Sequence, residues 1–233
     1  MVKFSGEVLK DKSTGDTVSF AVAEVLCREI RRIHGEGVGL GIVLGGGNIF
    51  RGLVANEKFG IDRVLGDHIG MLATVVNAMA ISGCLKNMGV PSIVLSALQM
   101  VDICETYYPR YGQQYIEEGK VLLLAGGTGK AFFSTDSAAA LRAAELHCDV
   151  VVKATKVDGV YDKDPMRYGD GKKFEKISFR DVLVNHLSVM DSTAFSLCMD
   201  NGIPIIVVDG ESDPKNIGRA IDGEAVGTTI YKD

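Results

Sequence analysis

The stretch KVLLLAGGTGKAFFSTDSAAALRAAELH, residues 120–147, contains an apolar run, a glycine-rich turn and a helical pattern in succession. The apolar run over 120–127 is continuous rather than alternating, which is typical of a parallel strand that is covered on both faces. Hydroxyl groups and small helix-forming residues begin at Ser134, and they predict a helix over 134–147. A strand that leads through a short turn into a helix is the repeating unit of an α/β fold.

The same succession recurs along the rest of the chain. Further strands are predicted in MVKFSGE (1–7) and at 37–47, 90–97, 148–155 and 203–210. Helical patterns occupy 16–35, 66–89, 190–202 and 213–223. Asp67 suits a helix cap, and Pro214 suits a first helical position. The alternation predicts an α/β fold with a mostly parallel sheet that carries helices on both faces.

Composition and charge restrict the classes of function. The chain has 233 residues, of which 46% are hydrophobic, enough for a globular core. The net charge of −5 argues against a broad nucleic-acid-binding or membrane-binding surface. The five cysteines are widely spaced, so reduced thiols are expected rather than disulfides or a zinc site. No signal peptide follows Met1 and the apolar runs are short, so we expect a cytoplasmic protein.

The glycine-rich turn at 126–130 does not match the common short phosphate-binding motifs. In the P-loop pattern G-x-x-x-x-G-K-[ST], Ala131 stands where a hydroxyl is required and Leu124 stands where the first glycine is required. The dinucleotide pattern G-x-G-x-x-G fails at Phe132. A phosphate site in this turn must therefore be of another kind.

Three loops that follow predicted strands are rich in glycine or polar residues: LGGGNIFRG (44–52), GGTGK (126–130) and KATKVDGVYDKDP (153–165). Ligands of open α/β sheets bind beyond the carboxyl ends of the strands, so these loops predict a shared site on one edge. Helix N-termini on that edge present N–H groups and the positive end of the helix dipole to phosphate. A phosphate-bearing ligand fits such an edge.

Residues of this edge have both a binding and a structural interpretation. Lys3 could reach a phosphate from the end of the first strand, or it could be an exposed terminal lysine. Arg51 could pair with phosphate as a fork beside Gly46 and Gly47, or it could follow a tight strand-to-helix turn. Asp67 could accept hydrogen bonds from ribose hydroxyls, or it could only cap a helix.

The second loop, GGTGK, and the helix start that follows it offer further candidates. The hydroxyls of Thr128, Ser134 and Thr135 flank two phenylalanines, an arrangement that could hold an anion and border a nucleobase. Asp136 repels phosphate unless a cation lies between them, so a lysine or Mg²⁺ is implied there. The structural alternative is a capping box with a hydrophobic staple. In the loop at 153–165, Tyr161 could stack on an adenine ring and Asp164 could bind a hydroxyl or amine of adenosine. The alternative is a plain turn at Asp158-Gly159.

Six segments together resemble one family: KFSGE, GGGNIFRG, RVLGDHIGMLATVVNAMA, GGTGKAFFSTDSAAALRAAEL, DVVVKATKVDGVYDKDP and VMDSTAF. In this order they resemble the bacterial UMP kinases (uridylate kinases) of the amino acid kinase superfamily. The resemblance implies a three-layer α/β/α sandwich of the amino acid kinase fold. It implies a single domain over 1–233, with the acceptor-nucleotide part at roughly 1–150 and the ATP-binding part at roughly 151–233. The implied reaction moves the γ-phosphoryl group of ATP to UMP, giving UDP and ADP with Mg²⁺, in pyrimidine nucleotide biosynthesis.

The resemblance also assigns residues to sites, position by position. The UMP site would comprise Gly46, Asp67, Thr128, Gly129, Phe132, Phe133, Ser134 and Thr135. The ATP site would comprise Lys3, Ser5, Gly6, Gly47, Arg51, Thr155, Tyr161 and Asp164. The catalytic group would comprise Lys3, Arg51, Asp136 and Lys153. Asp136 would orient Lys3 and Lys153, while Mg²⁺ would bridge the ATP phosphates with few protein ligands.

Assembly and regulation are implied by the same resemblance. A homohexamer is expected, and inhibition by UTP is common in the family. The segment LKDKSTGDTVSF (9–20) departs from the glycine-rich form that is linked to GTP activation in some members. Lys130-Ala131 stands where other members often carry Asn-Pro. Only two residues precede Lys3, where the family usually has a longer first strand, so we expect this strand to be short.

Two alternatives stay open on the sequence. Another kinase of the superfamily, for carbamate, acetylglutamate or isopentenyl phosphate, would share the fold, although the loop at 126–139 and GDHIGM (66–71) argue against it. A non-catalytic nucleotide sensor would bind without turnover, although the presence of Lys3, Arg51, Asp67 and Asp136 together argues against it.

Overall fold

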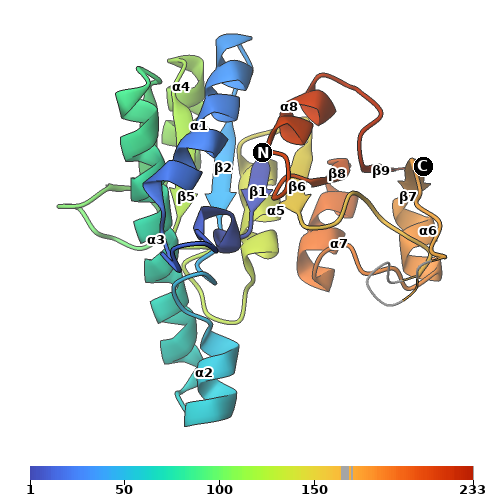
Figure 1. Cartoon of the computed structure of the whole chain (residues 1–233), viewed down its shortest axis with the longest axis horizontal. Coiled ribbons are helices and arrows are strands. Elements are labelled where there is room, and N and C mark those ends of the chain that lie inside the picture. Colours follow the sequence, from blue (N-terminus) through green and yellow to red (C-terminus); the bar gives the residue numbers. More distant parts are fainter. Residues whose placement is uncertain (164–167, 169, 233) are drawn as a thin grey trace.

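The computed structural model describes residues 1–163, 168 and 170–232, which surround one central sheet (Figure 1). The strands are β1 (Val2–Phe4), β2 (Gly41–Leu44), β3 (Ser92–Ser96), β4 (Glu105–Thr106), β5 (Val121–Ala125), β6 (Val151–Thr155), β7 (Lys176–Ser178), β8 (Ile205–Asp209) and β9 (Thr228–Tyr231). Their order in the sheet is β4-β3-β5-β2-β1-β6-β8-β9-β7. Among these strands β8 and β9 are antiparallel, and the other neighbouring pairs are parallel. The predicted mostly parallel sheet is confirmed.

Helices cover both faces of the sheet. They are the 3₁₀-helix η1 (Gly6–Leu9) and the α-helices α1 (Phe20–Gly35), α2 (Gly52–Phe59), α3 (Arg63–Asn87), α4 (Pro109–Glu117), α5 (Thr135–Glu145), α6 (Phe179–Val184), α7 (Ser192–Asp200) and α8 (Lys215–Ile221). One core cluster joins α1, α3 and α8 to the sheet, and a second joins α5, α6 and α7 to the opposite face (Figure 1). The α/β fold with helices on both faces is therefore confirmed.

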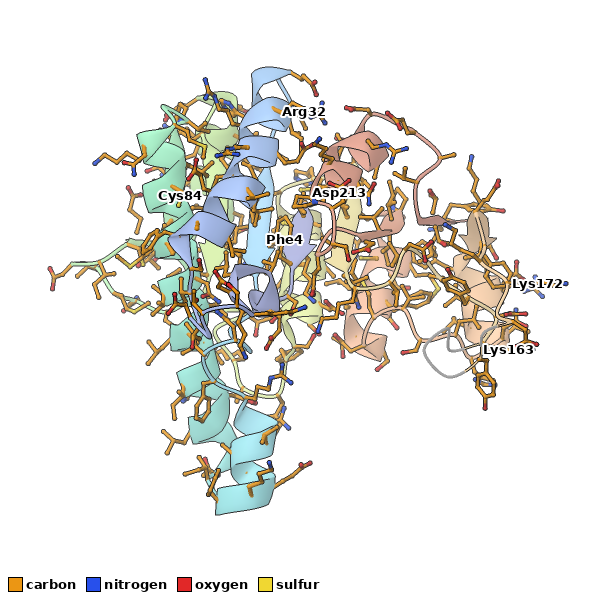
Figure 2. All side chains as sticks on the ribbon, in the orientation of Figure 1. Phe4, Arg32, Cys84, Lys163, Lys172 and Asp213 are labelled. Atoms are coloured by element: carbon orange, nitrogen blue, oxygen red, sulfur yellow. The ribbon has the colours of Figure 1, made fainter. Side chains whose placement is uncertain are left out.

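The central strands show why the apolar runs were continuous in the sequence. Every residue of β2 and β5 is buried, because helices pack on both faces of these strands. Phe4 of β1 is 1% exposed and lies near the centre of the molecule (Figure 2). The first strand is short, as expected, with three residues.

Helix α3 is long and apolar enough, by length and composition alone, to cross a membrane. The sequence prediction that every apolar run was too short overlooked it, because polar and glycine residues interrupt the run. More than half of its most apolar window is buried inside the protein, against the sheet and α1. We therefore assign α3 to the core.

Two helix starts differ from the sequence prediction. The side chain of Asp62 caps α3 by accepting a hydrogen bond from the N–H of Leu65 at 3.0 Å. Asp67 lies one turn inside the helix, so its prediction as a cap was wrong. Gly66 lies within α3 rather than at its start, and it packs against Gly52 of α2. A Cβ added at Gly66 would lie 3.1 Å from the Cα of Gly52. Pro214 is the N-cap of α8 rather than its first helical residue.

Several elements were not predicted from the sequence. The strands β4, β7 and β9 lie at or near the edges of the sheet and have two to four residues each. The helices α2, α4 and α6 have six to nine residues each. Each of these segments is short, so it carries only a weak helical or alternating pattern.

A buried pair of amides fixes the loop after β2. Asn77 of α3 donates from Nδ2 to the carbonyl of Gly45 at 2.7 Å and to Oδ1 of Asn48 at 2.8 Å. Asn48 donates in turn to the carbonyl of Thr17 at 2.8 Å. Gly6 packs so closely here that an added Cβ would lie 2.2 Å from Asn48 Oδ1. The start of the glycine-rich loop is therefore held by core contacts.

Candidate functional site

The predicted polar loops leave the sheet on one edge. Ser5-Gly6 follows β1, residues 45–51 follow β2, and residues 126–134 follow β5. Because β5, β2, β1 and β6 are parallel neighbours, the segments after them emerge together. The structure thus brings the glycine-rich segments together at the carboxyl ends of the strands, where α/β proteins bind ligands.

Three charged side chains meet at this edge. Lys3 and Lys153 are register partners on β1 and β6, so their side chains emerge on the same face. Asp136, in the first turn of α5, lies between them. Its Oδ1 is 2.8 Å from Nζ of Lys3, and its Oδ2 accepts a hydrogen bond from Nζ of Lys153 at 2.7 Å. Lys153 also donates to the carbonyl of Val189 at 2.5 Å. We call these three charged residues the Lys–Asp–Lys cluster.

The charge state of Asp136 follows from these neighbours. Burial raises the pKa of its carboxyl, but the ammonium groups of Lys3 and Lys153 outweigh burial, and the pKa lies below the ordinary value of 3.8. Asp136 is therefore a carboxylate at neutral pH. With two ammonium groups and one carboxylate, the cluster keeps a net positive charge, which suits a phosphate.

Arg51 is already engaged by the protein. Its Nη2 donates to Oε1 of Glu7 at 2.6 Å, and its Nε donates to the carbonyl of Gly47 at 3.0 Å. The hydrogen bond from Arg51 is the main cause of a lowered pKa of Glu7. The sequence assigned Arg51 to phosphate but did not identify Glu7, so a phosphate at Arg51 must share it with this carboxylate.

A cavity of about 480 Å³ opens between the loops and α3; we call it the acceptor cavity. Its lining includes most residues that the resemblance assigned to the acceptor: Gly46, Asp67, Thr128, Phe132, Phe133, Ser134 and Thr135. Gly47 and Arg51, assigned to the ATP side, also line it. Gly129 lies instead in the turn itself, with a φ of 76° that favours glycine.

Asp67 faces this cavity with its carboxylate oriented by two partners. Nε of Arg63 donates to both of its oxygens at 2.9 Å, and the N–H of Phe132 donates to Oδ2 at 2.8 Å. The sequence singled out Asp67 and Phe132 separately, but no pattern in the sequence identified Arg63. Its position four residues before Asp67 on one helix was the available signal.

Ser134 has the capping role that the sequence offered as an alternative. Its Oγ accepts from the N–H of Ser137 at 3.1 Å, which begins α5. A full capping box is not formed, because the third helical position is Ser137 rather than Glu or Gln. Ser134 and Ser137 both donate their hydroxyls to Asp191, the N-cap of α7. Asp191 was not predicted, and it ties the end of the 126–134 loop to α7.

A second cavity, of about 470 Å³, lies after β6. Its lining includes Tyr161, which the resemblance assigned to ATP, and the segments 157–163 and 185–188. Tyr161 donates its hydroxyl to Asp158 at 2.6 Å. Thr155 lies at the end of β6, where its carbonyl accepts from the N–H of Gly210 at 3.2 Å. Asp164, also assigned to ATP, lies outside the described residues.

Comparisons with known proteins match most or all of the chain. The sequence pattern of the family described as "Amino acid kinase family" matches residues 1–209. The chain is similar to the solved structure of UMP kinase from Bacillus anthracis, with 34% identity, a TM-score of 0.94, and coverage of 100% of this chain and 95% of that one. The structure of UMP kinase from Ureaplasma parvum has 35% identity and a TM-score of 0.93, with coverage of 99% of this chain and 97% of that one. The structure of uridylate kinase from Archaeoglobus fulgidus has 25% identity and a TM-score of 0.72, with coverage of 98% of each chain.

The charge balance of the Lys–Asp–Lys cluster predicts a pH-dependent stability. Asp136→Asn leaves two largely buried ammonium groups, 13% and 15% exposed, without a counter-ion, so we expect it to lower the free energy of unfolding by about 3 kcal/mol at neutral pH. The folded-state pKa of Asp136 is depressed, so its contribution is present above pH 3.8 and is lost as the pH falls through the lower folded value. Urea unfolding of both proteins across this range measures the difference.

Asp200→Asn, at the exposed end of α7, is the matched control and should change stability by less than about 0.5 kcal/mol. A difference between wild type and Asp136→Asn that stays constant from neutral pH to below pH 3.8 would contradict the assigned charge state.

Proposed function

The chain belongs to the amino acid kinase family, and from this premise we propose that it transfers the γ-phosphoryl group of ATP to UMP, giving UDP and ADP. Full-length similarity to structures of bacterial UMP kinases supports the proposal. The observation that carries it is the Lys–Asp–Lys cluster, because residues next to the cluster in the sequence line both cavities. Thr135, next to Asp136, lines the acceptor cavity, and Ser188, next to Val189, lines the second cavity.

The chemistry of the cluster suits direct transfer between two phosphates. Phosphoryl transfer requires mainly positioning and neutralisation of charge. The attacking oxygen of UMP is already ionised, so no nucleophilic side chain and no strong base are needed. Lys3 and Lys153 would neutralise charge on the transferring group, and Asp136 would hold both ammonium groups in place. Arg51 and the N–H groups of 46–47 would hold phosphate oxygens.

Mg²⁺ is the cofactor that we propose, carried mainly by the phosphates of ATP. Within the part of the chain that the structure describes, no three Asp, Glu, His or Cys side chains gather as a metal site. The one carboxylate of the cluster, Asp136, is engaged by two lysines. This donor set fits a cation that keeps water and phosphate ligands, as Mg²⁺ commonly does. When bound, Mg²⁺ supplies further neutralisation of phosphate charge.

The acceptor cavity favours a nucleotide over smaller acceptors. Phe132 and Phe133 provide aromatic surface for a base, and Asp67 provides a carboxylate for ribose hydroxyls. Carbamate or acetylglutamate would use neither feature. A purely sensory protein would not need the charge-neutralising cluster, because that cluster favours a transferring phosphoryl group.

We extend the proposal to organisation and context. Residues 1–233 would form one domain, whose acceptor part covers roughly 1–150 and whose ATP part covers roughly 151–233. The acceptor cavity is lined from the first part and the second cavity from the other, which supports this division. The enzyme would act in the cytoplasm in pyrimidine nucleotide biosynthesis, with UTP and GTP as candidate effectors.

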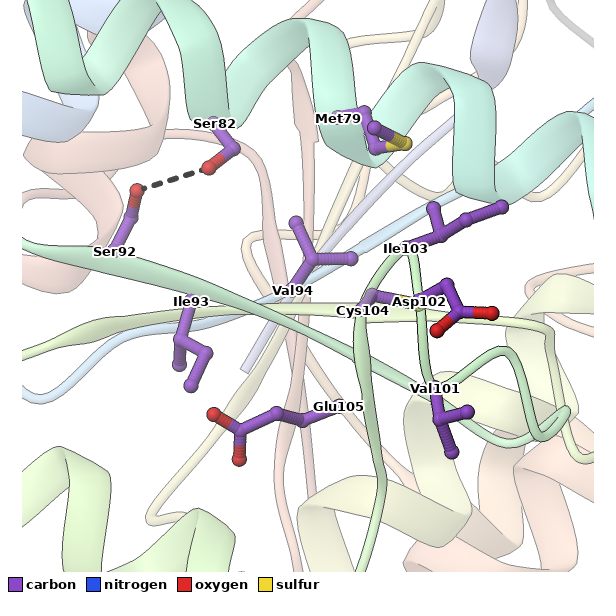
Figure 3. Close-up of a pocket in the computed structure, with 10 residues that line it drawn as sticks. All are labelled: Met79, Ser82, Ser92, Ile93, Val94, Val101, Asp102, Ile103, Cys104 and Glu105. Carbon is purple, nitrogen blue, oxygen red and sulfur yellow. Dashed lines mark hydrogen bonds between the residues drawn. The ribbon is translucent and has the colours of Figure 1, made fainter.

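Self-association as a homohexamer is part of the proposal. Helix α3 presents an apolar row at helical spacing, with each side chain about half exposed: Leu65, Leu72, Val76 and Met79. Val101 and Ile103, exposed on the segment before β4, border a groove of about 450 Å³ together with Met79 (Figure 3). Such contiguous apolar surface is typical of an interface, and we assign it to a second copy of the chain.

A coupled assay of ADP release tests the reaction. With ATP and Mg²⁺, we offer UMP, CMP, carbamate and acetylglutamate in turn, and we expect turnover with UMP alone. Turnover with a different acceptor would keep the kinase assignment and reject UMP. Binding of UMP without any turnover would instead favour a nucleotide sensor.

Lys3→Met in the same assay tests the role of the cluster. We expect kcat to fall by at least about a hundredfold, because a fixed charge at the transferring group is lost, while the KM for UMP changes little. Lys86→Met, exposed near the end of α3, is the matched control and should keep the wild-type kcat. A near-normal kcat for Lys3→Met, with folding intact, would remove Lys3 from the mechanism.

Val76→Glu tests the proposed interface. A charge in the centre of the apolar row would have to be buried without a partner, so we expect the mass measured by sedimentation to fall from six chains to fewer. Val184→Glu, equally apolar and exposed on α6, is the control and should leave the mass unchanged. A wild-type protein that sediments as one chain, or an unchanged mass for Val76→Glu, would reject this interface.

A further inference from the structure

Arg63 lines the acceptor cavity without having a role in the proposed reaction. It is the first residue of α3, and its Nε donates to both carboxylate oxygens of Asp67 at 2.9 Å. Its guanidinium also lies over the ring of Phe132, 5.5 Å from the ring centroid. The Arg63 side chain is 33% exposed, so it borders the cavity rather than the core. Arg63 thereby connects α3 to the loop at 126–134.

The contacts of Asp67 leave little freedom to its carboxylate. Arg63 uses one hydrogen-bonding position on each carboxylate oxygen, and the N–H of Phe132 uses a further position on Oδ2. A carboxylate offers about four such positions, so about one remains, on Oδ1. We infer that Arg63 is a positioning residue for ribose recognition, which fixes the carboxylate of Asp67 so that its remaining oxygen position meets a ribose hydroxyl. The inference rests on the proposed function, in which Asp67 binds the ribose of UMP.

The backbone conformation of Phe132 provides further support. Its φ of 71° lies in the left-handed region that residues other than glycine rarely adopt, and its side chain is 68% exposed. An exposed residue keeps such a conformation only where contacts hold it. The contacts available to Phe132 are its N–H to Asp67 and its ring against Arg63. Arg63 thus holds both the acid and the loop residue that borders it.

The Arg63–Asp67 pair differs from an ordinary pair on a helix surface. Arg28 and Glu24 form such a pair on α1, with the same spacing and a distance of 2.7 Å, and both side chains are more than half exposed. Exposed pairs of this kind contribute little to stability. Asp67, by contrast, is 16% exposed and has both oxygens engaged. The two pairs therefore provide a test variant and a matched control.

The experiment is calorimetric binding of UMP and of 2′-deoxy-UMP to the full chain. We expect wild type to prefer UMP, and Arg63→Gln to lower the affinity for UMP about tenfold while lowering that for 2′-deoxy-UMP much less. Arg63→Lys, which keeps the charge but not the two-oxygen contact, should lose part of the preference. Arg28→Gln should bind both ligands as wild type does. In an Asp67→Asn background, Arg63→Gln should add little, because it acts through the carboxylate.

The ratio of the two affinities decides the inference. An equal loss for both ligands, which leaves the ratio unchanged, would show that Arg63 contributes only general positive charge. Unchanged affinities for both ligands would show that Arg63 has no role in binding. Either result overturns the inference alone. If wild type binds neither nucleotide, the proposed function fails and the inference fails with it. A thermal unfolding scan of each variant separates lost binding from lost folding.

Discussion

Two lysines on adjacent buried strands, with one aspartate between them, are the constraint on which the functional edge depends. The parallel register of β1 and β6 places Lys3 beside Lys153, and two largely buried ammonium groups are costly unless a counter-charge is supplied. Asp136 supplies it from the first turn of α5, which requires that helix to begin against the edge of the sheet. That position in turn places Ser134 at the helix start and holds the preceding loop above the strands.

The sequence predicted the architecture where burial produces a clear pattern of apolar residues. The continuous apolar runs at 120–127 and 37–47 correspond to β5 and β2, which are buried along their whole length because helices cover both faces. The prediction failed where the local signal was ambiguous. Gly66 resembled a helix boundary but lies within α3, where the absence of a side chain allows the close contact with Gly52 of α2. Short elements near the sheet edges carried only a weak pattern.

The candidate site was predictable by residue type but not by partnership. The sequence indicated that Arg51 and Ser134 are chemically important, yet their partners Glu7 and Asp191 lie 44 and 57 residues away along the chain. Such pairs arise only when the fold brings distant loops together. Arg63 was four residues from Asp67 and still escaped notice, because a helical pair of this spacing is common on surfaces and becomes informative only with burial.

The two sides of the edge are held in physically different ways. Around Gly6 and Gly46 the backbones approach so closely that an added Cβ would lie 2.2 Å from Asn48 Oδ1 and 2.5 Å from the carbonyl of Gly70, respectively. This side is rigid because it is packed into the core, as a phosphate-binding surface should be. Phe132 is held instead by contacts inside the acceptor cavity, namely the hydrogen bond from its N–H to Asp67 and the Arg63 guanidinium over its ring. The Lys–Asp–Lys cluster belongs to the packed side, on β1, β6 and the first turn of α5. We therefore expect adjustment to a bound nucleotide to fall on the exposed Phe132 and Phe133 rather than on the cluster.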